Sequence, residues 1–418
     1  MVLLANLKQS TTVLLIIASI FISAELPAQS KSIAIYGETI HTMAKTADGK
    51  WQQPISDGVV LIVDGKITAV GPQASVEVPE GALEMRGKVV TPGLIDARSV
   101  VGLAGWLNID HDSDHIERSS PIQPELAALD AYNPREPLIE WVRSFGVTTL
   151  HTGHAPGQLI SGQTFIVKTR GNSVDDAVVQ RQSMVAATLG SDALRSGKES
   201  PGTRAKQMSM LRQKFIEAKA YQEKVAKAAA DEEKDAPARD LRKEAMVQIL
   251  EGKMPLMINA HSSVDIQNVL RLQKEWQIPV VLQGGAECYD FIEPLKAQGI
   301  PVILHPTMMR SSGVGKNASM DTAAKLIAAG VPVAMGSGYE SYVPKKFKKT
   351  NTWNVRCMVD ESLVPSDQQT SVLYCRLSDF RPYCLNNLYT VTTHLYFNSL
   401  GSPIRLIPVI FKQPLRKT

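Results

Sequence analysis

Histidines that follow short apolar runs are the side chains of this chain best suited to chemistry. Four of them lie at the ends of predicted strands: His151, His154, His261 and His305. A neutral imidazole can bind a divalent metal or transfer a proton. Because a catalytic metal usually takes three protein ligands and a water, His151, His154 and His261 are candidate metal ligands, and His261 is the candidate catalytic residue. A hydrogen-bonded His261 without chemistry is the alternative.

The spacing of the histidines and other polar residues leaves alternatives open. Strict strand alternation places His151 and His154 on opposite faces, so they converge only if Gly153 turns the backbone. The acidic run 110–115 lacks the glycine and the terminal glutamate of a calcium loop, which favours a solvated loop. Lys168 and Arg170 could bind an anionic substrate group, and His305, which could face the pocket, is a further candidate for substrate binding. Lys168 and Arg170 could instead cap an edge of the sheet.

The pattern of apolar runs predicts an α/β protein with a small β domain first. Residues 32–37 and 58–71 read as strands, and the second segment is a hairpin turned at Asp64-Gly65. From Val89 onward, short apolar runs alternate with helical stretches, which is typical of parallel strands with crossover helices. The candidate strands are 89–97, 146–150, 164–168, 256–260, 280–282, 301–304 and 331–335. Residues 202–252 predict two helices with solvated charged faces. A barrel closes such a sheet, and its chemistry lies at the carboxyl ends of the strands.

Two sequence runs resemble the metal-dependent amidohydrolase superfamily over roughly residues 31–344. They are "VVTPGLIDA" at 89–97 and "DGKITAVGP" at 64–72; residues 161–171 are similar to exported imidazolonepropionase-like amidohydrolases. The resemblance implies a small N-terminal β-sandwich and a (β/α)8 TIM-like barrel. It also implies hydrolysis of a carbon–nitrogen bond, in a cyclic amide or peptide-like substrate, by hydroxide bound to a divalent metal such as zinc.

This chain departs from the superfamily pattern at the residues that hold the metal. Arg98 and Val100 stand where the resemblance implies a His-x-His pair, and arginine has no lone pair to give a metal. Gly284 lies where a further histidine is expected, and Gly338 replaces the aspartate that takes a proton from water. Only His261 transfers from that pattern. The alternative function is therefore an inactive amidohydrolase-fold protein that binds a small molecule or acts as a scaffold.

Composition and the chain ends complete the sequence-based expectations. The 418 residues are 44% hydrophobic with a net charge of +4, which fits a globular protein and does not indicate a nucleic-acid partner. The apolar run 13–22 predicts a cleaved secretory signal and no stable membrane anchor, hence a periplasmic or secreted protein. A small-molecule substrate or ligand is expected as partner, and a homo-oligomer is compatible with the sequence.

Four segments follow from these observations. They are a signal peptide at 1–28, a small β-sandwich domain at 29–88, an amidohydrolase-like barrel at 89–344 and an atypical tail at 345–418. The tail holds three of the four cysteines and has no clean period of helix or strand. A shifted reading frame at the end of the gene would produce such a segment, and a divergent domain is the alternative.

Overall fold

The computed structural model describes the chain from Ser32 to Gly336 with short gaps. The described residues are 32–48, 51–105, 110–197, 199–231, 233, 235–304 and 313–336, and the backbone of 393–395. The predicted signal peptide, His305, Gly338 and nearly all of the tail lie outside them. The described residues divide into two compact units: residues 32–40 and 54–90 belong to one, and residues 41–53 and the described residues from 91 onward belong to the other.

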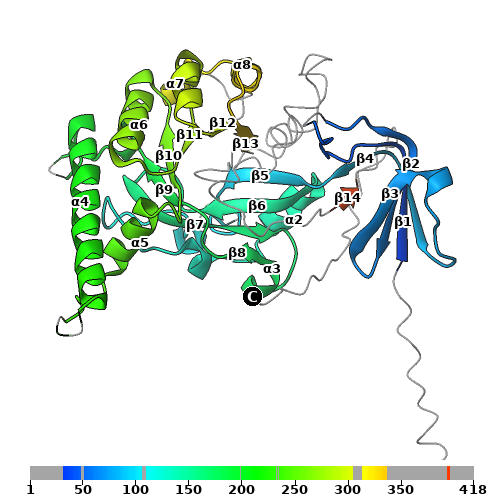
Figure 1. The fold of residues 1–418 in the computed structure, drawn as a ribbon, viewed down its shortest axis with the longest axis horizontal. Helices are drawn as coiled ribbons and strands as arrows, with labels where there is room; N and C mark the ends of the chain where they lie inside the picture. Colours follow the sequence, from blue (N-terminus) through cyan, green and yellow to red (C-terminus); the bar gives the residue numbers. More distant parts are fainter. Residues whose placement is uncertain are drawn as a thin grey trace, which may run out of the picture. The chain divides into compact units, whose positions relative to one another are not determined.

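The smaller unit is built on a single sheet (Figure 1). Its strands are β1 (Ser32–Ile40), β2 (Ile55–Val63), β3 (Lys66–Pro72) and β4 (Leu83–Pro92), and their order in the sheet is β4-β1-β2-β3. Asp64 and Gly65 turn the β2–β3 hairpin with φ angles of 49° and 75°, which confirms the predicted tight turn. The described residues contain one sheet here, so the second layer of the predicted sandwich stays a prediction.

The larger unit alternates strands and helices along the chain. Its strands are β5 (Leu94–Ser99), β6 (Val147–Gly153), β7 (Ile160–Lys168), β8 (Val178–Gln180), β9 (Val185–Thr188), β10 (Leu256–Ala260), β11 (Val280–Gly284), β12 (Val302–Leu304) and β13 (Val333–Met335). Its helices are α2 (Pro137–Ser144), α3 (Val174–Ala177), α4 (Arg204–Ala229), α5 (Leu241–Leu250), α6 (Ser263–Trp276), α7 (Ile292–Ala297) and α8 (Thr322–Ala328). The predicted pair of helices within 202–252 is confirmed as α4 and α5.

These strands form a nearly closed, barrel-like sheet. Their order is β13-β12-β11-β10-β9-β7-β6-β5, with β8 paired to β7, and β13 lies beside β5. Each strand in the run β9-β10-β11-β12-β13 is parallel to the next, and β5 is parallel to β6. β7, in contrast, is antiparallel to β6, β8 and β9. The predicted (β/α)8 barrel is therefore corrected at β7, which was expected to be a parallel strand. The cause is the short 154–159 connection, which cannot hold the crossover that parallel strands need.

The predicted strand 89–97 is also corrected, because it is two strands that meet at Gly93. β4 ends at Pro92 and β5 begins at Leu94. A Cβ on Gly93 would lie 2.2 Å from Cγ2 of Thr148, so only glycine lets the backbone pass this close to β6. The first strand of the barrel therefore begins at Leu94 and not at Val89.

Successive side chains of the barrel strands point alternately into the barrel and out toward the helices. The interior cluster takes a residue from most strands and consists of Ala97, Ile166, Met184, Ala186, Met257, Val281, Ile303 and Ala334. The neighbouring residues of β10, Leu256 and Ile258, pack outward in the cluster that includes Ile266 and Val269 of α6. Helices α4, α6 and α7 cover that outer face (Figure 1). None of the helices in the described ranges is both long and apolar enough to cross a bilayer.

Candidate functional site

The carboxyl ends of the parallel strands, called the barrel mouth below, are occupied by a layer of polar residues. Ser99, Asn259 and Gln283 each follow an interior apolar residue by two positions, on β5, β10 and β11. Side chains two apart share a face of a strand, so Asn259 and Gln283 lie on the interior face toward the mouth. On β5 the register with β6 shifts between Asp96 and Ser99, so strict alternation does not hold there, and Arg98 reaches Gln283. Ser99, Asn259 and Gln283 are all buried, with exposed fractions of 0%, 3% and 1%. The layer is thus shielded from bulk water.

The guanidinium of Arg98 lies at the centre of this layer. Its Nε donates to Oε1 of Gln283 at 3.2 Å, across the barrel from β5 to β11. Its Nη1 donates to the carbonyl oxygens of Ser99, at 2.7 Å, and Gly153, at 3.4 Å, and its Nη2 donates to the carbonyl of His154. The side chain has an exposed fraction of 0%. One buried cation therefore joins three strands of the barrel.

A buried carboxylate accompanies this cation. Asp96, two residues earlier on β5, has an exposed fraction of 0%, and its Oδ1 accepts a hydrogen bond from the backbone N–H of Arg98 at 3.2 Å. Arginine stays protonated under all ordinary conditions, so the positive charge at the mouth is permanent. An opposite charge on the same strand reduces the cost of burying it.

His151 is fully buried and has both ring nitrogens engaged. Its Nδ1 lies 2.8 Å from the carbonyl oxygen of Ala97 and must donate there, which makes Nε2 the acceptor of the Thr164 hydroxyl at 2.6 Å. Burial, and next the positive charge of Arg98, lowers the pKa of His151 to about 4. The imidazole is therefore neutral at pH 7, but it has no lone pair left for a metal.

His154 and His261 are the other two predicted metal ligands. Burial, followed by the charge of Arg98, lowers the pKa of His154 to about 4. Its ring lies against Gly162, where a Cβ would come within 2.5 Å of Cδ2. The ring of His261 lies over Gly284 on the next strand, with Nε2 2.8 Å from the place of a Cβ. Each ring thus fills space beside a glycine.

The predicted anion-binding residues lie away from this layer. β6 and β7 pair with Gly153 opposite Thr164 and Thr149 opposite Lys168. Because Gly153 is at the mouth, Lys168 lies at the other end of the barrel, where its Nζ donates to Oγ1 of Thr149 at 2.9 Å. Burial, and next Arg170, lowers the pKa of Lys168 to about 8. Arg170 follows at that same end, and His305 lies outside the described residues.

The donor set does not fit a catalytic zinc ion. In the part of the chain that the structure describes, no three His, Cys, Asp or Glu side chains lie together as a metal-binding group. His151 has no free lone pair, and a metal beside His154 would lie near the positive charge of Arg98. The predicted ligand set of His151, His154 and His261 is thus not brought together by the described geometry.

Sequence reasoning missed the residues that occupy the metal's place. Arg98 was recognised as a lost ligand but not as the centre of a network, and Asn259 and Gln283 were not singled out. Their signal is a polar residue two positions after an interior apolar one on adjacent strands, as in Met257 with Asn259 and Val281 with Gln283. Among the described residues, three buried atoms of this layer find no hydrogen-bond partner: Ser99 Oγ, Asn259 Oδ1 and Gln283 Nε2.

Comparison with known proteins finds similar solved structures. No protein-family model matches the chain. It is similar to the crystal structure of an amidohydrolase from Thermotoga maritima MSB8, with 25% identity and a TM-score of 0.70 over 80% of this chain and 85% of that one. A molinate hydrolase structure has 13% identity and a TM-score of 0.46, with 85% of each chain covered.

A curated fungal protein matches part of the sequence. The amidohydrolase tasK of Hapsidospora irregularis is 31% identical over 114 residues, which is 27% of this chain. The match spans 12% of the length of that relative.

Proposed function

This chain belongs to the amidohydrolase superfamily, and from that premise we propose that it binds a small molecule at the barrel mouth without hydrolysing it through a metal-bound hydroxide. The observation that carries the proposal is the guanidinium of Arg98, which is buried among acceptors from three strands at the mouth. The two hydrogen bonds of His151 support it further, because they leave that imidazole without a lone pair for zinc.

The class of ligand follows from the superfamily and from the mouth. Amidohydrolases act on carbon–nitrogen bonds, so we propose an amide, such as a cyclic amide of the imidazolonepropionase-like kind, as the ligand. An amide offers a carbonyl acceptor and, where the nitrogen is not fully substituted, an N–H donor. The buried layer holds both counterparts, since Gln283 Nε2 is a donor and Asn259 Oδ1 an acceptor. His261, half-buried after β10, is the proposed contact nearest to solvent.

A binding screen with the full-length chain tests the proposal. Cyclic amides and N-acyl amino acids would be screened by thermal shift, and hits measured by calorimetry with the metal chelated and with zinc added. We expect binding that chelation does not change, and no product by mass spectrometry. A zinc-dependent release of product, or the absence of any binder among both ligand classes, would overturn it.

Hydrolysis of a carbon–nitrogen bond remains the second candidate. The 25% identity with the Thermotoga amidohydrolase over 80% of this chain favours it. His261 would then be the catalytic residue, so His261→Ala should abolish product formation while Lys168→Met, at the other end of the barrel, should not. Equal rates in both variants would exclude this role of His261.

We also propose that the protein acts outside the cytoplasm. The run 13–22 and the small residues up to Ala28 support cleavage near Gln29, and this segment lies outside the described residues. Intact-mass measurement on protein from the native host would give the mature N-terminus. A retained Met1 in the exported fraction would contradict cleavage.

A further inference from the structure

We infer that the guanidinium of Arg98 is a built-in cation that holds the strand ends of the barrel mouth together and closes this place to a divalent metal. The inference concerns the architecture of the mouth and does not depend on which ligand binds there. It predicts that the stability of the barrel depends on Arg98, as the stability of a metalloprotein can depend on its bound metal.

The backbone acceptors of Arg98 are carbonyl oxygens at the ends of strands, where the hydrogen-bond ladder of the sheet stops. The carbonyls of Ser99 and Gly153 belong to the last residues of β5 and β6, and the carbonyl of His154 follows directly. A buried carbonyl without a donor costs stability comparable to a lost hydrogen bond. Arg98 offers five N–H donors in a fixed plane, so a single side chain can serve several of these oxygens at once.

The contact with Gln283 extends the link across the barrel. β5 and β11 are not neighbours in the sheet, since β12 and β13 lie between them. The hydrogen bond from Arg98 Nε to Gln283 Oε1 therefore connects strands that share no backbone ladder. A metal ion held by side chains from several strands would make the same kind of connection.

The same position is closed to a metal for reasons of charge and space. A divalent ion at the centre of the layer would meet the permanent charge of Arg98 without screening by water. Replacing Gly284 by histidine would not add a ligand, because its φ is +87° and a Cβ would lie 2.5 Å from Cε1 of His261. Arg98 therefore opposes a divalent ion by its charge, and position 284 supplies no ligand for one.

Substitutions of Arg98 in the full-length chain test the cation's structural role. Arg98→Met removes the charge and the donors at similar volume, and we expect its melting temperature to fall by about 5 to 10 °C, as for a broken buried charge network. Arg98→Lys keeps the charge without the planar fork, so its melting temperature should lie between those of the wild type and Arg98→Met. Arg181→Met, on an exposed ion pair with Asp175, is the control and should change the melting temperature by less than about 1 °C.

Two substitutions of opposite charge at Gln283 keep the inference testable if Arg98 variants do not fold. Gln283→Glu places a carboxylate against the guanidinium and should preserve or raise the melting temperature, whereas Gln283→Lys should lower it sharply. Zinc and a chelator should each leave the melting temperature of the wild-type chain unchanged.

Three results would overturn the inference. They are an Arg98→Met protein as stable as the control, equal tolerance of Glu and Lys at position 283, and a zinc-dependent rise in wild-type melting temperature that the chelator reverses. The first two readouts involve neither ligand binding nor turnover. A failure in either of these two is thereby distinguishable from failure of the proposed function, which the ligand screen tests.

Discussion

At the scale of single residues, Glu136 is a buried acid that the candidate site does not use. It directly precedes α2, has an exposed fraction of 4%, and its Oε2 accepts a hydrogen bond from the backbone N–H of Gly105 at 3.3 Å. Burial raises the pKa of Glu136 to about 7, and the negative charge of Asp112 adds to the rise. Since the acid is easier to protonate in the folded state, its contribution to stability is complete below pH 4.5 and is lost as pH rises to about 7.

Glu136→Gln should therefore stabilise the protein at pH 8 and change little at pH 4.5. The shift of about 2.5 pKa units corresponds to about 3 kcal/mol at the higher pH. Urea denaturation at the two pH values gives the difference in unfolding free energy. Glu140→Gln, on the exposed face of α2, is the matched control. A Glu136→Gln protein with the same pH dependence as wild type would show that this carboxyl is not buried in its charged form.

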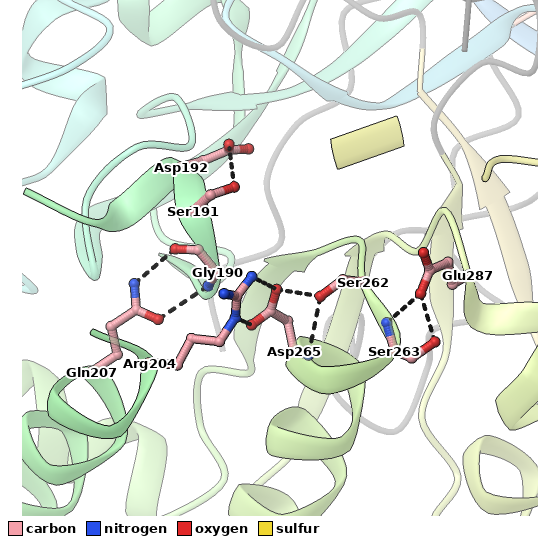
Figure 2. A network of polar contacts seen from close by, with 9 residues as sticks. All are labelled: Gly190, Ser191, Asp192, Arg204, Gln207, Ser262, Ser263, Asp265 and Glu287. Atoms are coloured by element: carbon pink, nitrogen blue, oxygen red, sulfur yellow. Dashed lines mark hydrogen bonds and ion pairs between the residues drawn. The ribbon is translucent and has the colours of Figure 1, made fainter. Parts of the chain in front are cut away.

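At the scale of elements, a polar network ties together the loops that follow β9, β10 and β11 (Figure 2). Asp265 at the start of α6 accepts two hydrogen bonds from Arg204 of α4, at 2.7 and 3.0 Å, and one from the Ser262 hydroxyl at 2.6 Å. Gln207 of α4 bonds both the N–H and the carbonyl of Gly190. The long, largely polar helix α4 is thus anchored at its first turns to the mouth.

Gly190→Ala should disrupt this network. Gly190 has a φ of +96°, and a Cβ there would lie 2.3 Å from Oδ2 of Asp265. Backbone strain and a displaced ion pair together should cost about 2 to 4 kcal/mol of unfolding free energy. Gly202→Ala is the control, because no atom lies within 4 Å of its Cβ position, and it should be neutral within about 0.5 kcal/mol. Equal stability of the two variants would contradict this account.

The elements show which features local sequence patterns can predict. The tight turn at Asp64-Gly65 and the strand 256–260 depend on residues close in the chain, and both were predicted correctly. The direction of β7 was predicted wrongly, because an apolar run does not indicate which way a strand runs. The length of the 154–159 connection did contain that information, since it is too short for a parallel crossover. The role of Arg98 could not be predicted, since its acceptors at Gly153, His154 and Gln283 lie 55 to 185 residues away.

At the scale of the whole molecule, the barrel mouth couples folding to pH through charge. Arg98 is permanently positive, and the neutral forms of His151 and His154 are held beside it with pKa values of about 4. A base whose pKa is lowered by folding contributes stability that is present above pH 6.5 and lost as pH falls toward 4. Glu136 acts in the opposite direction between pH 7 and 5, and so conceals part of this loss.

Acidification from pH 7 to pH 5 should therefore destabilise the Glu136→Gln protein more than the wild type. Each imidazole should contribute a loss of about 2 kcal/mol over this window, so Glu136→Gln should lose about 4 kcal/mol, and the wild type about half of that. Adding His154→Met to Glu136→Gln should halve the loss, because Met has a similar volume and no proton to bind. Urea denaturation at both pH values gives all three numbers. If the Glu136→Gln protein is equally stable at pH 7 and pH 5, the imidazoles are not held neutral by burial beside Arg98, and this electrostatic description of the mouth is wrong.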